Sequence, residues 1–418
     1  MKHVVVVGGG VVGLTTAWSL ADAGFAVSLV ERGTALATGA SFANGGQLSY
    51  RYVSPLADAG IPLKALRWLF AADSPQQFRP QADPQQWRWM ACFLAHCTSA
   101  ANRRTTERLL RLGSLSQSAF ADIARHVPAD AIALRRPGKL VVYRSRREFA
   151  RAATAARAAV TMAPGEVRVL DADACVACEP ALADARALLA GGIFTASEEV
   201  ADCHAFCLQL AKRLAEREGV ELLTGIDVAG FVLRDGRIRA VTTSAGEIGT
   251  DAVVIAAGLG SVGLAASAGL RLPIYPVKGY SLTAPVGPGH FAPAVSVTDF
   301  ERKVLYARIG DDLRVAAMAD LVGNDESIDP KRIAALQRIV RATLPRAADY
   351  DRAVPWAGLR PATPGGAPII GRTPVQGLWL NVGHGPLGFT LAAGTARIVA
   401  ALIAGRGSPI PLDGMMHT

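Results

Sequence analysis

Short apolar runs separated by glycine turns open the chain. Residues 4–7 are four valines, the pattern of a buried strand, and an apolar helical pattern follows the glycines after them. A second apolar strand pattern ends at Glu31. This order of strand, glycine turn, helix and strand predicts a βαβ unit in the first fifty residues.

The rest of the chain mixes helix and strand patterns without an internal repeat. Residues 51–130 are predicted to be mostly helical, and 231–250 alternate as a small β-meander with a turn at Asp235-Gly236. Further helices are predicted at 146–160, 202–218, 330–343 and 387–404. Strands are predicted at 138–143, 220–227, 251–257, 281–283, 303–308, 313–318 and 378–381.

Strand–glycine–helix units at both ends and in the middle of the chain predict a discontinuous cofactor domain. We expect an α/β fold with a Rossmann-type dinucleotide-binding domain formed by residues 1–50, 196–270 and 352–418. Residues 51–195 and 271–351 are expected to form an α+β substrate domain with a mixed sheet. That domain includes the helical segment 60–130.

Two stretches without charged residues, 252–270 and 377–396, are long enough to suggest membrane spans. Both contain glycines and turn signals, and the second also carries Asn381, His384 and Pro386. We therefore predict buried strand–turn–helix units here rather than transmembrane helices. The N-terminus begins with the glycine-interrupted strand and not with a signal-peptide pattern.

The charge and cysteine content narrow the class of protein. The formal net charge of the 418 residues is +9, but the arginines are scattered, so no nucleic-acid partner is expected. Four cysteines, Cys175, Cys178, Cys203 and Cys207, could bind zinc or an iron–sulfur cluster. Their apolar helical surroundings favour ordinary packing, so no metal is expected. Free thiols fit a reducing, cytoplasmic location.

The segment 60–94 combines aromatic and basic residues. Trp68, Phe70, Trp87, Trp89 and Phe93 occur there together with Lys64, Arg67 and Arg88. Such a mixture is typical of an element that lies on a membrane surface. Core helices are the alternative interpretation, and the pattern favours it slightly.

The glycine turn after the first strand carries the most specific chemistry. Gly8, Gly10 and Gly13 form a G-x-G-x-x-G pattern: a tight turn, a close backbone approach to a pyrophosphate, and close helix–strand packing. The helix N-terminus, at Val11 and Val12, offers free N–H groups to phosphates. Glu31, next to Arg32, can accept hydrogen bonds from a ribose. The pattern predicts an adenine dinucleotide and leaves NAD and FAD both open.

Several separated blocks resemble one enzyme family. They are VVVVGGGVVGLTTAWSL, SFANGGQLS, IPLKALRWLF, ADCHAF, YPVKGYSLT, WAGLRPATPGGAPIIGR and LWLNVGHGPLGFTLAAG. These blocks are similar to the FAD-dependent amino-acid oxidoreductases of the D-amino-acid oxidase, glycine oxidase and sarcosine oxidase superfamily. Within it they most resemble the small-subunit type of D-amino-acid dehydrogenase. The second glycine-rich block near the C-terminus favours FAD over NAD.

The resemblance implies a set of cofactor contacts beyond the first turn. The helix that follows residues 381–388 would face the flavin edge on which negative charge develops upon reduction. His384 is either a flavin contact or a structural histidine. The implied contacts are Ser41, Asn44, Gly45, Gly46, Gln47, Val228, Ala257, Gly258, Gly383, His384, Gly385, Leu387, Gly388, Phe389 and Thr390. No cysteine is placed as in the covalently flavinylated members, so non-covalent FAD is expected.

The resemblance also implies the substrate contacts and the reaction. Arg360, expected after a strand, would pair with a substrate carboxylate through its planar guanidinium, and Tyr280 could donate to the same carboxylate. Lys278 is a further candidate near the flavin. The implied reaction is the oxidative deamination of a D-amino acid to a 2-oxo acid and ammonia. The expected electron acceptor is a quinone or another respiratory partner. The protein itself is expected to be an oligomer or a subunit of a heteromeric complex.

Departures from the family pattern leave other functions open. Gly365 and Gly366 stand where the family often has Asp-Gly, and Pro386 and Phe389 replace a Thr and a Trp. The alternatives are a D-proline or D-hydroxyproline dehydrogenase, a glycine dehydrogenase subunit, an oxygen-using oxidase, and a non-catalytic FAD-binding subunit. The expected location is the cytoplasm, with contact to the cytoplasmic face of the inner membrane through the segment 60–94.

Overall fold

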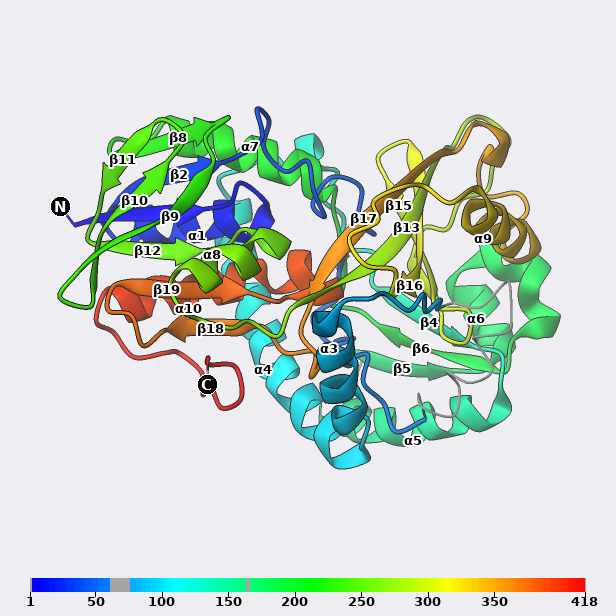
Figure 1. The fold of residues 1–418 in the computed structure, drawn as a ribbon. Helices are drawn as coiled ribbons and strands as arrows, with labels where there is room; N and C mark the ends of the chain where they lie inside the picture. Colours follow the sequence, from blue (N-terminus) through cyan, green and yellow to red (C-terminus); the bar gives the residue numbers. More distant parts are fainter. Residues whose placement is uncertain (1, 61–75, 163–165, 418) are drawn as a thin grey trace.

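Two large β-sheets lie side by side and form the two lobes of the protein (Figure 1). The computed structural model describes residues 2–60, 76–162 and 166–417. The segment 60–94 was expected to contact a membrane surface, and its residues 61–75 lie outside the described residues. The N-terminus and the C-terminus both lie on the first lobe (Figure 1).

The sheet of the first lobe is assembled from three distant stretches of the chain. Its strand order is β18-β19-β12-β1-β2-β8. All neighbouring pairs are parallel except β18 and β19. The strands are β1 (His3–Val7), β2 (Ala26–Glu31), β8 (Val220–Thr224), β12 (Ala252–Ile255), β18 (Ile369–Arg372) and β19 (Leu378–Val382). The predicted βαβ unit is confirmed, and the strand predictions at 251–257 and 378–381 are each correct to within three residues.

Alternate valines of β1 enter two different cores. Val4 and Val6 pack with the helices α1 (Val11–Asp22), α7 (Cys203–Ala215) and α10 (Gly388–Ile403). Val5 and Val7 pack on the other face, beneath the meander β9 (Val228–Arg234), β10 (Arg237–Thr243) and β11 (Gly246–Gly249) and beside α8 (Ser261–Ser267). A strand that is covered on both faces needs a continuous apolar run, which explains the four successive valines.

The second lobe is an eight-stranded mixed sheet. Its order is β17-β13-β16-β15-β14-β4-β6-β5. The strands are β4 (Lys139–Tyr143), β5 (Val167–Leu170), β6 (Gly191–Thr195), β13 (Tyr275–Pro285), β14 (Ser296–Asp299), β15 (Val304–Ile309), β16 (Asp312–Asp320) and β17 (Val354–Ala362). Helix α9 (Pro330–Thr343) and helix α6 (Ala172–Cys178) pack on one face of this sheet, and α5 (Arg146–Met162) packs beside β5 and β6.

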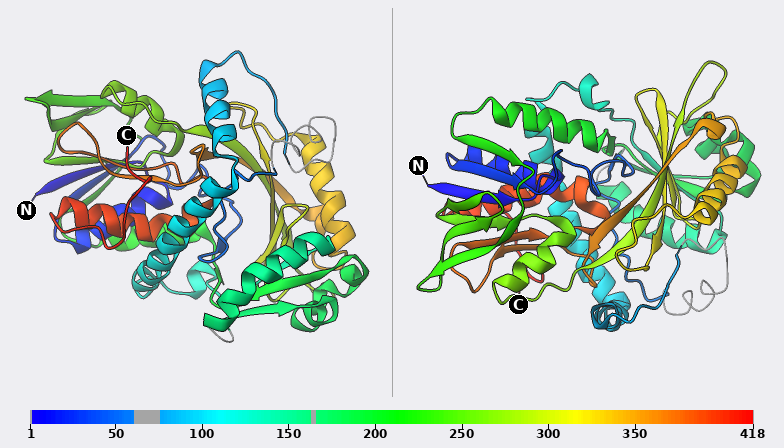
Figure 2. Two further views of the ribbon diagram at one scale, coloured as in Figure 1. Left: turned by 90° about the horizontal axis from the view of Figure 1, so that it is seen from below. Right: turned by 45° about the horizontal axis from the view of Figure 1, so that its top comes forward.

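The segment predicted to be mostly helical contains two long helices, α3 (Pro84–His96) and α4 (Ser99–Ala124). Residues 51–60 are irregular rather than helical. Helix α4 packs against α10 of the first lobe, although it was expected with the substrate domain (Figure 2). The cause is a close approach: a Cβ on Gly394 of α10 would lie 2.9 Å from the Cα of Ser116. The Ser116 hydroxyl also donates to the Thr390 carbonyl at 2.6 Å.

The charge-free stretch near the C-terminus is a core helix with its preceding strand. Among the described residues, Gly385–Ile403 is apolar and long enough to cross a membrane, yet 61% of its most apolar window is buried inside the protein. Helix α10 supplies Leu391, Ile398 and Val399 to the core of the first lobe. The hydropathy of this segment is thus explained by burial within the protein.

The cysteines of the expected packing group separate into two cores. Cys203 and Cys207 lie on α7 in the core of the first lobe, whereas Cys175 lies in the core of the second lobe. Burial raises the pKa of the Cys207 thiol well above its usual value. The four thiols therefore do not converge on a single point.

Candidate active site

A cavity of about 2070 Å³ lies between the two lobes. Its floor is the carboxyl end of the six-stranded sheet, where the turns after β1, β12 and β19 meet. Its roof is the face of the eight-stranded sheet opposite to α9. In doubly wound sheets the carboxyl edge is where ligands bind, and this cavity has that position.

Neighbouring atoms leave no room for a side chain at two glycines of the first turn. Gly8 has φ +116°, and a Cβ there would lie 2.6 Å from the Ala256 carbonyl oxygen. A Cβ on Gly13 would lie 1.7 Å from the Gly8 carbonyl oxygen, so Gly13 sets the close packing of α1 on β1. At Gly10 a Cβ would meet only the Ser41 hydroxyl, at 3.4 Å, and would otherwise fill the cavity. The backbone at Gly10 is therefore open to a ligand.

Glu31 joins the turn to the second strand. Its two carboxylate oxygens accept the N–H of Gly9 at 2.6 Å and the N–H of Gly33 at 2.8 Å. Glu31 and Arg32 also line the cavity. The carboxylate thus orders the backbone of the turn, and its remaining acceptor capacity faces the cavity. Its role toward a ribose stays a prediction.

A second glycine turn brings another helix N-terminus to the same cavity. Gly383 and Gly385 have φ +77° and +53°, and α10 begins directly afterwards with Leu387 as its N-cap residue. Glycine at Gly10 and leucine at Leu387 offer no polar side chain for capping, so the first N–H groups of α1 and α10 depend on other partners. Ser41 satisfies one of them, because its hydroxyl accepts the Val11 N–H at 3.1 Å.

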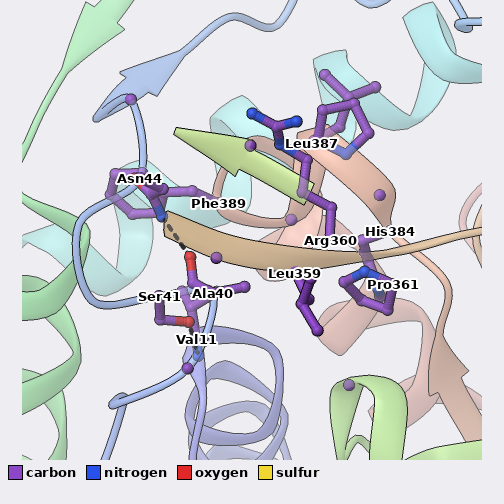
Figure 3. A pocket seen from close by; sticks show the side chains of 18 of the residues that line it. Val11, Ala40, Ser41, Asn44, Leu359, Arg360, Pro361, His384, Leu387 and Phe389 are labelled. Atoms are coloured by element: carbon purple, nitrogen blue, oxygen red, sulfur yellow. Dashed lines mark hydrogen bonds between the residues drawn. The ribbon is translucent and has the colours of Figure 1, made fainter. Parts of the chain in front are cut away.

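These features fit a dinucleotide cofactor. Two helix N-termini supply positive potential and N–H donors to one elongated cavity. The buried side-chain oxygen of Asn381, which also lines the cavity, finds no hydrogen-bond donor among the described residues. Figure 3 shows Val11, Ser41 and Asn44 on one side of the cavity and Arg360, His384 and Leu387 on the other.

The loop of Ser41 to Gln47 is held against the roof. A Cβ on Gly45 would lie 2.6 Å from a methyl of Leu305, and the Asn44 carbonyl accepts from Arg314 at 2.8 Å. Gln47 is in the short strand β3 (Gln47–Leu48), which pairs with β7 (Glu199–Val200). This loop therefore crosses between the two lobes along the cavity wall.

His384 is a buried neutral histidine. It is 3% exposed, and its Nε2 lies 3.0 Å from the Thr395 hydroxyl. Burial lowers the pKa of its imidazole to about 3. The residue lines the cavity, and its hydrogen bond goes back to α10. Both earlier interpretations, a cofactor contact and a structural histidine, therefore agree with its position.

Arg360 is a partly buried cation on the cavity wall. It was expected to follow a strand, but it lies within strand β17. Its guanidinium covers Gly279 of β13, where a Cβ would lie 2.0 Å from Nη2, and Nη1 donates to the Met318 carbonyl at 2.8 Å. Burial lowers the pKa of Arg360 to about 10, and Asp320 opposes that shift. A partly buried planar guanidinium that lines a cavity is suited to a carboxylate ligand.

Tyr280 lies on the opposite face of the roof from Arg360. In β13, Val277 pairs with Arg360, whereas Tyr280 pairs with Ala357 and Ala317. Successive residues of a strand face opposite sides, and the Tyr280 ring is in the core beneath α9. This position of the ring argues against the predicted hydrogen bond from Tyr280 to a substrate carboxylate, although Tyr280 is among the residues that line the cavity. Lys278 is on the same far face, where its ammonium lies 3.5 Å from Asp325.

The structure brings nearly all predicted site residues to this cavity; the exceptions are Gly13, which packs beneath the turn, and Lys278, which lies on the far face of the sheet. The predicted residues that line it are Gly8, Gly10, Val11, Val12, Glu31, Arg32, Ser41, Asn44, Gly45, Gly46, Gln47, Val228, Ala257, Gly258, Tyr280, Arg360, Gly383, His384, Gly385, Leu387, Gly388, Phe389 and Thr390. Sequence reasoning missed Tyr52, Lys139 and Met318, which also line it. The positive φ of Met318, +69°, has no signal in the sequence.

Comparison with known proteins places these features in a family. The family described as FAD dependent oxidoreductase, or DAO, matches residues 3–402. D-amino acid dehydrogenase 2 of Pseudomonas aeruginosa is 48% identical over 99% of this chain and 98% of its own length. D-amino acid dehydrogenase 2 of Ralstonia nicotianae is 45% identical over 98% of each chain.

Solved structures share the fold at lower identity. Glycine oxidase from Geobacillus kaustophilus has a TM-score of 0.76 at 22% identity, over 100% of this chain and 99% of that one. An FAD-bound L-α-glycerophosphate oxidase from Mycoplasma pneumoniae has a TM-score of 0.71 at 18% identity, over 98% of this chain and 97% of that one. At these identities the likeness concerns the fold alone.

Proposed function

The chain belongs to the DAO family of FAD-dependent oxidoreductases, and from that premise we propose that it is a D-amino acid dehydrogenase. Its cofactor is FAD. The observation that carries the proposal is the partly buried guanidinium of Arg360 in the wall of the cavity to which both helix N-termini point. Full-length relatives at 45–48% identity that are named for D-amino acids support the choice of substrate class.

The residues that would hold FAD divide between its two ends. The turn of Gly8 and Gly10 and the N-terminus of α1 suit the pyrophosphate. The turn of Gly383 and Gly385 and the N-terminus of α10 suit the flavin edge. When bound, FAD accepts a hydride equivalent from the substrate and passes on its electrons.

Arg360 would bind and orient the substrate. Its remaining N–H groups pair with the α-carboxylate, so that the amino acid has a fixed orientation in the cavity. The Met318 carbonyl holds the guanidinium in place through Nη1. Because burial lowers the pKa of the His384 imidazole to about 3, it is too weak a base to take a proton from the substrate amine. An amine that binds in its neutral form needs no protein base.

The overall conversion balances as follows. The D-amino acid loses the Cα hydrogen with its electron pair and one proton from nitrogen, which gives an imino acid. Water then adds to the imino carbon, and ammonia leaves to give the 2-oxo acid. The two electrons and two protons that the amino acid loses leave to a quinone, which becomes a quinol, or to another respiratory acceptor.

The proposed acceptor implies a location. We place the protein in the cytoplasm, with contact to the cytoplasmic face of the inner membrane. Helix α3 supports that contact, because Trp87 and Leu94 are 49% and 46% exposed. The opposite side of α3 is fixed to the protein: Trp89 is buried, and its indole N–H donates to the Ala362 carbonyl at 2.8 Å.

Anaerobic reduction of the holoenzyme tests the function. D- and L-amino acids, glycine, sarcosine and D-hydroxyproline would be added separately, with loss of visible flavin absorbance as the readout. D-amino acids are expected to bleach the flavin fastest, and a soluble quinone analogue is expected to restore the colour faster than oxygen does. A flavin that no D-amino acid reduces, or that oxygen reoxidises faster than the quinone, contradicts the proposal.

A further inference from the structure

A buried lysine lies in the cavity wall far from Arg360. Lys139 is at the start of β4, is 3% exposed and lines the cavity. Four strands separate β17, which carries Arg360, from β4. At roughly 4.8 Å per strand, this separation is about 24 Å along the sheet. An amino acid bound through its carboxylate at Arg360 is much shorter, so Lys139 does not reach the substrate.

The ammonium of Lys139 is held against the loop that crosses the cavity wall. Its Nζ donates to Gln47 Oε1 at 2.7 Å and to the Ser49 hydroxyl at 2.8 Å, and it lies 4.4 Å from the centre of the Tyr52 ring. Tyr52 and Gln47 line the cavity as well. These contacts fix the position of the charge, since both hydrogen-bond partners belong to one short stretch of backbone.

The same stretch of backbone contacts the first turn of α10 from the other side. The Thr390 hydroxyl donates to the Gln47 carbonyl at 3.3 Å. The same hydroxyl accepts a hydrogen bond from the Ser49 N–H at 3.2 Å. Lys139 and the N-terminus of α10 therefore flank Gln47–Leu48 together. Two sources of positive potential, one a full charge and one a helix dipole, reach the same part of the cavity.

A buried carboxylate partly balances this lysine. Glu198 is 1% exposed, and its Oε1 accepts the Arg51 N–H at 2.7 Å. Burial raises the pKa of this carboxyl, while Lys139 and a side-chain hydrogen bond with Ser49 oppose that shift. Burial lowers the pKa of Lys139 to about 8, and Glu198 opposes that shift. A buried charge is costly to keep where an apolar side chain would fill the same space, so its position calls for an explanation.

We propose that Lys139 is an electrostatic element of the flavin site, which stabilises the extra negative charge of the reduced cofactor and so raises its reduction potential. The positive charge, held beside Gln47, adds to the field of the α10 N-terminus. Lys139 acts on FAD through this field and not by touching the substrate. The inference rests on FAD, which the family supplies, and not on which amino acid is oxidised.

Sulfite tests the proposal without any amino acid. Sulfite adds to oxidised flavin and leaves negative charge on the ring, so its affinity, read from the loss of visible absorbance, reports the local potential. Three variants of the holoenzyme separate charge from hydrogen bonding. Lys139→Met removes both, Lys139→Gln keeps a donor for Gln47 and Ser49 but no charge, and Lys139→Arg keeps the charge. Lys212→Met, on the exposed side of α7, is the matched control.

If the positive charge of Lys139 acts on the flavin, the variants should differ in sulfite affinity according to whether they keep that charge. Sulfite affinity is expected to fall about tenfold in both Lys139→Met and Lys139→Gln, the size of effect that one charge exerts over several ångströms in a protein. Lys139→Arg and Lys212→Met should stay within about threefold of the unchanged protein. A dye-coupled redox titration should shift by about −30 mV in the two neutral variants, the equivalent of tenfold for two electrons.

Other patterns overturn the proposal. Unchanged sulfite affinity in Lys139→Gln with a loss only in Lys139→Met would assign the lysine a hydrogen-bonding role. Release of FAD by all three variants, Lys139→Arg included, would assign it to packing of the loop. Neither result bears on amino-acid oxidation, so failure here is distinguishable from failure of the proposed function.

Discussion

Arg360 combines partial burial with a backbone anchor. Among the described residues, its Nη1 donates to the Met318 carbonyl, and its guanidinium lines the cavity. Burial alone destabilises the cation, as the lowered pKa of Arg360 indicates. A bound carboxylate would remove that penalty, so this side chain is built for an anionic partner.

Replacing Arg360 should therefore impair the use of substrate more than the binding of FAD. Arg360→Gln is expected to lower kcat/KM for a D-amino acid by roughly 10²–10³-fold, because one partner of a buried charge pair is lost. Arg360→Lys should recover only part of this, since an ammonium cannot form the bidentate pair. Dye-linked steady-state kinetics measure the effect, with flavin content as the control. Kinetics unchanged in both variants would remove Arg360 from the site.

Tyr280 provides the opposite expectation. Its ring is buried under α9, and burial raises the pKa of its phenol. Tyr280→Phe should leave KM within about threefold and change the free energy of unfolding by no more than about 1 kcal/mol. The same kinetic assay and a urea titration measure both. A tenfold rise in KM would return the phenol to the substrate site.

His384 should make the protein sensitive to acid. Its pKa of about 3 when folded lies below the value of about 6.5 expected in the unfolded chain. Between these values the unfolded chain binds the extra proton, so stability falls as the pH drops below 6.5. From this group alone, about 1 kcal/mol is expected to be lost between pH 6.5 and 5.5. Urea unfolding of the holoenzyme at several pH values, compared with His384→Gln, isolates this slope. Equal slopes in the two proteins would contradict the assignment.

At the scale of elements, the packing of α1 on β1 depends on Gly13. Gly13→Ala forces a Cβ to 1.7 Å from the Gly8 carbonyl, so the helix must shift. The expected cost is about 1–3 kcal/mol in the free energy of unfolding, together with weakened FAD retention. Gly407→Ala, with no atom within 4 Å of the added Cβ, is the matched control and should be neutral. Thermal unfolding and flavin content after gel filtration measure both changes. Full FAD occupancy in Gly13→Ala would contradict the argument.

The elements that sequence predicts well are those with a local cause. The βαβ unit and α10 follow from hydrophobic period and glycine position, which are read within a short window. Strand β17 has no such signal, because Pro355 and Pro361 interrupt it; as the edge strand of its sheet it tolerates prolines. The face occupied by Tyr280 depends on pairing with β16, including a register shift between Lys278 and Tyr280. Pairing of this kind joins distant residues, so sequence periodicity alone leaves it open.

The candidate site divides in the same way. Its glycine turns were predicted, because each has a local sequence motif. Lys139 was missed, since only the folded sheet brings β4 to the loop of Gln47. Helix α4 likewise joined the wrong lobe in the prediction, because its contact with α10 depends on two small residues, Ser116 and Gly394, that lie far apart in sequence.

At the scale of the whole molecule, the cavity between the lobes couples FAD to stability. A volume of about 2070 Å³ is bounded by both sheets, so a bound cofactor contacts each of them. Free FAD at 100 times its Kd should add about 2.7 kcal/mol to the free energy of unfolding. Thermal unfolding of apoprotein across an FAD titration measures this as a rising Tm. A Tm that is independent of FAD would mean that the cavity does not hold it.

The sequence positions of the two helix N-termini also affect how the protein is made. A ribosome delivers the turn of Gly8 at the start of synthesis and the turn of Gly383 only near residue 390. At about 5–20 residues per second, tens of seconds separate the two events. Throughout that interval the nascent chain lacks α10, the helix against which α1 packs. The complete FAD site therefore forms only after both glycine turns and α10 have been synthesised.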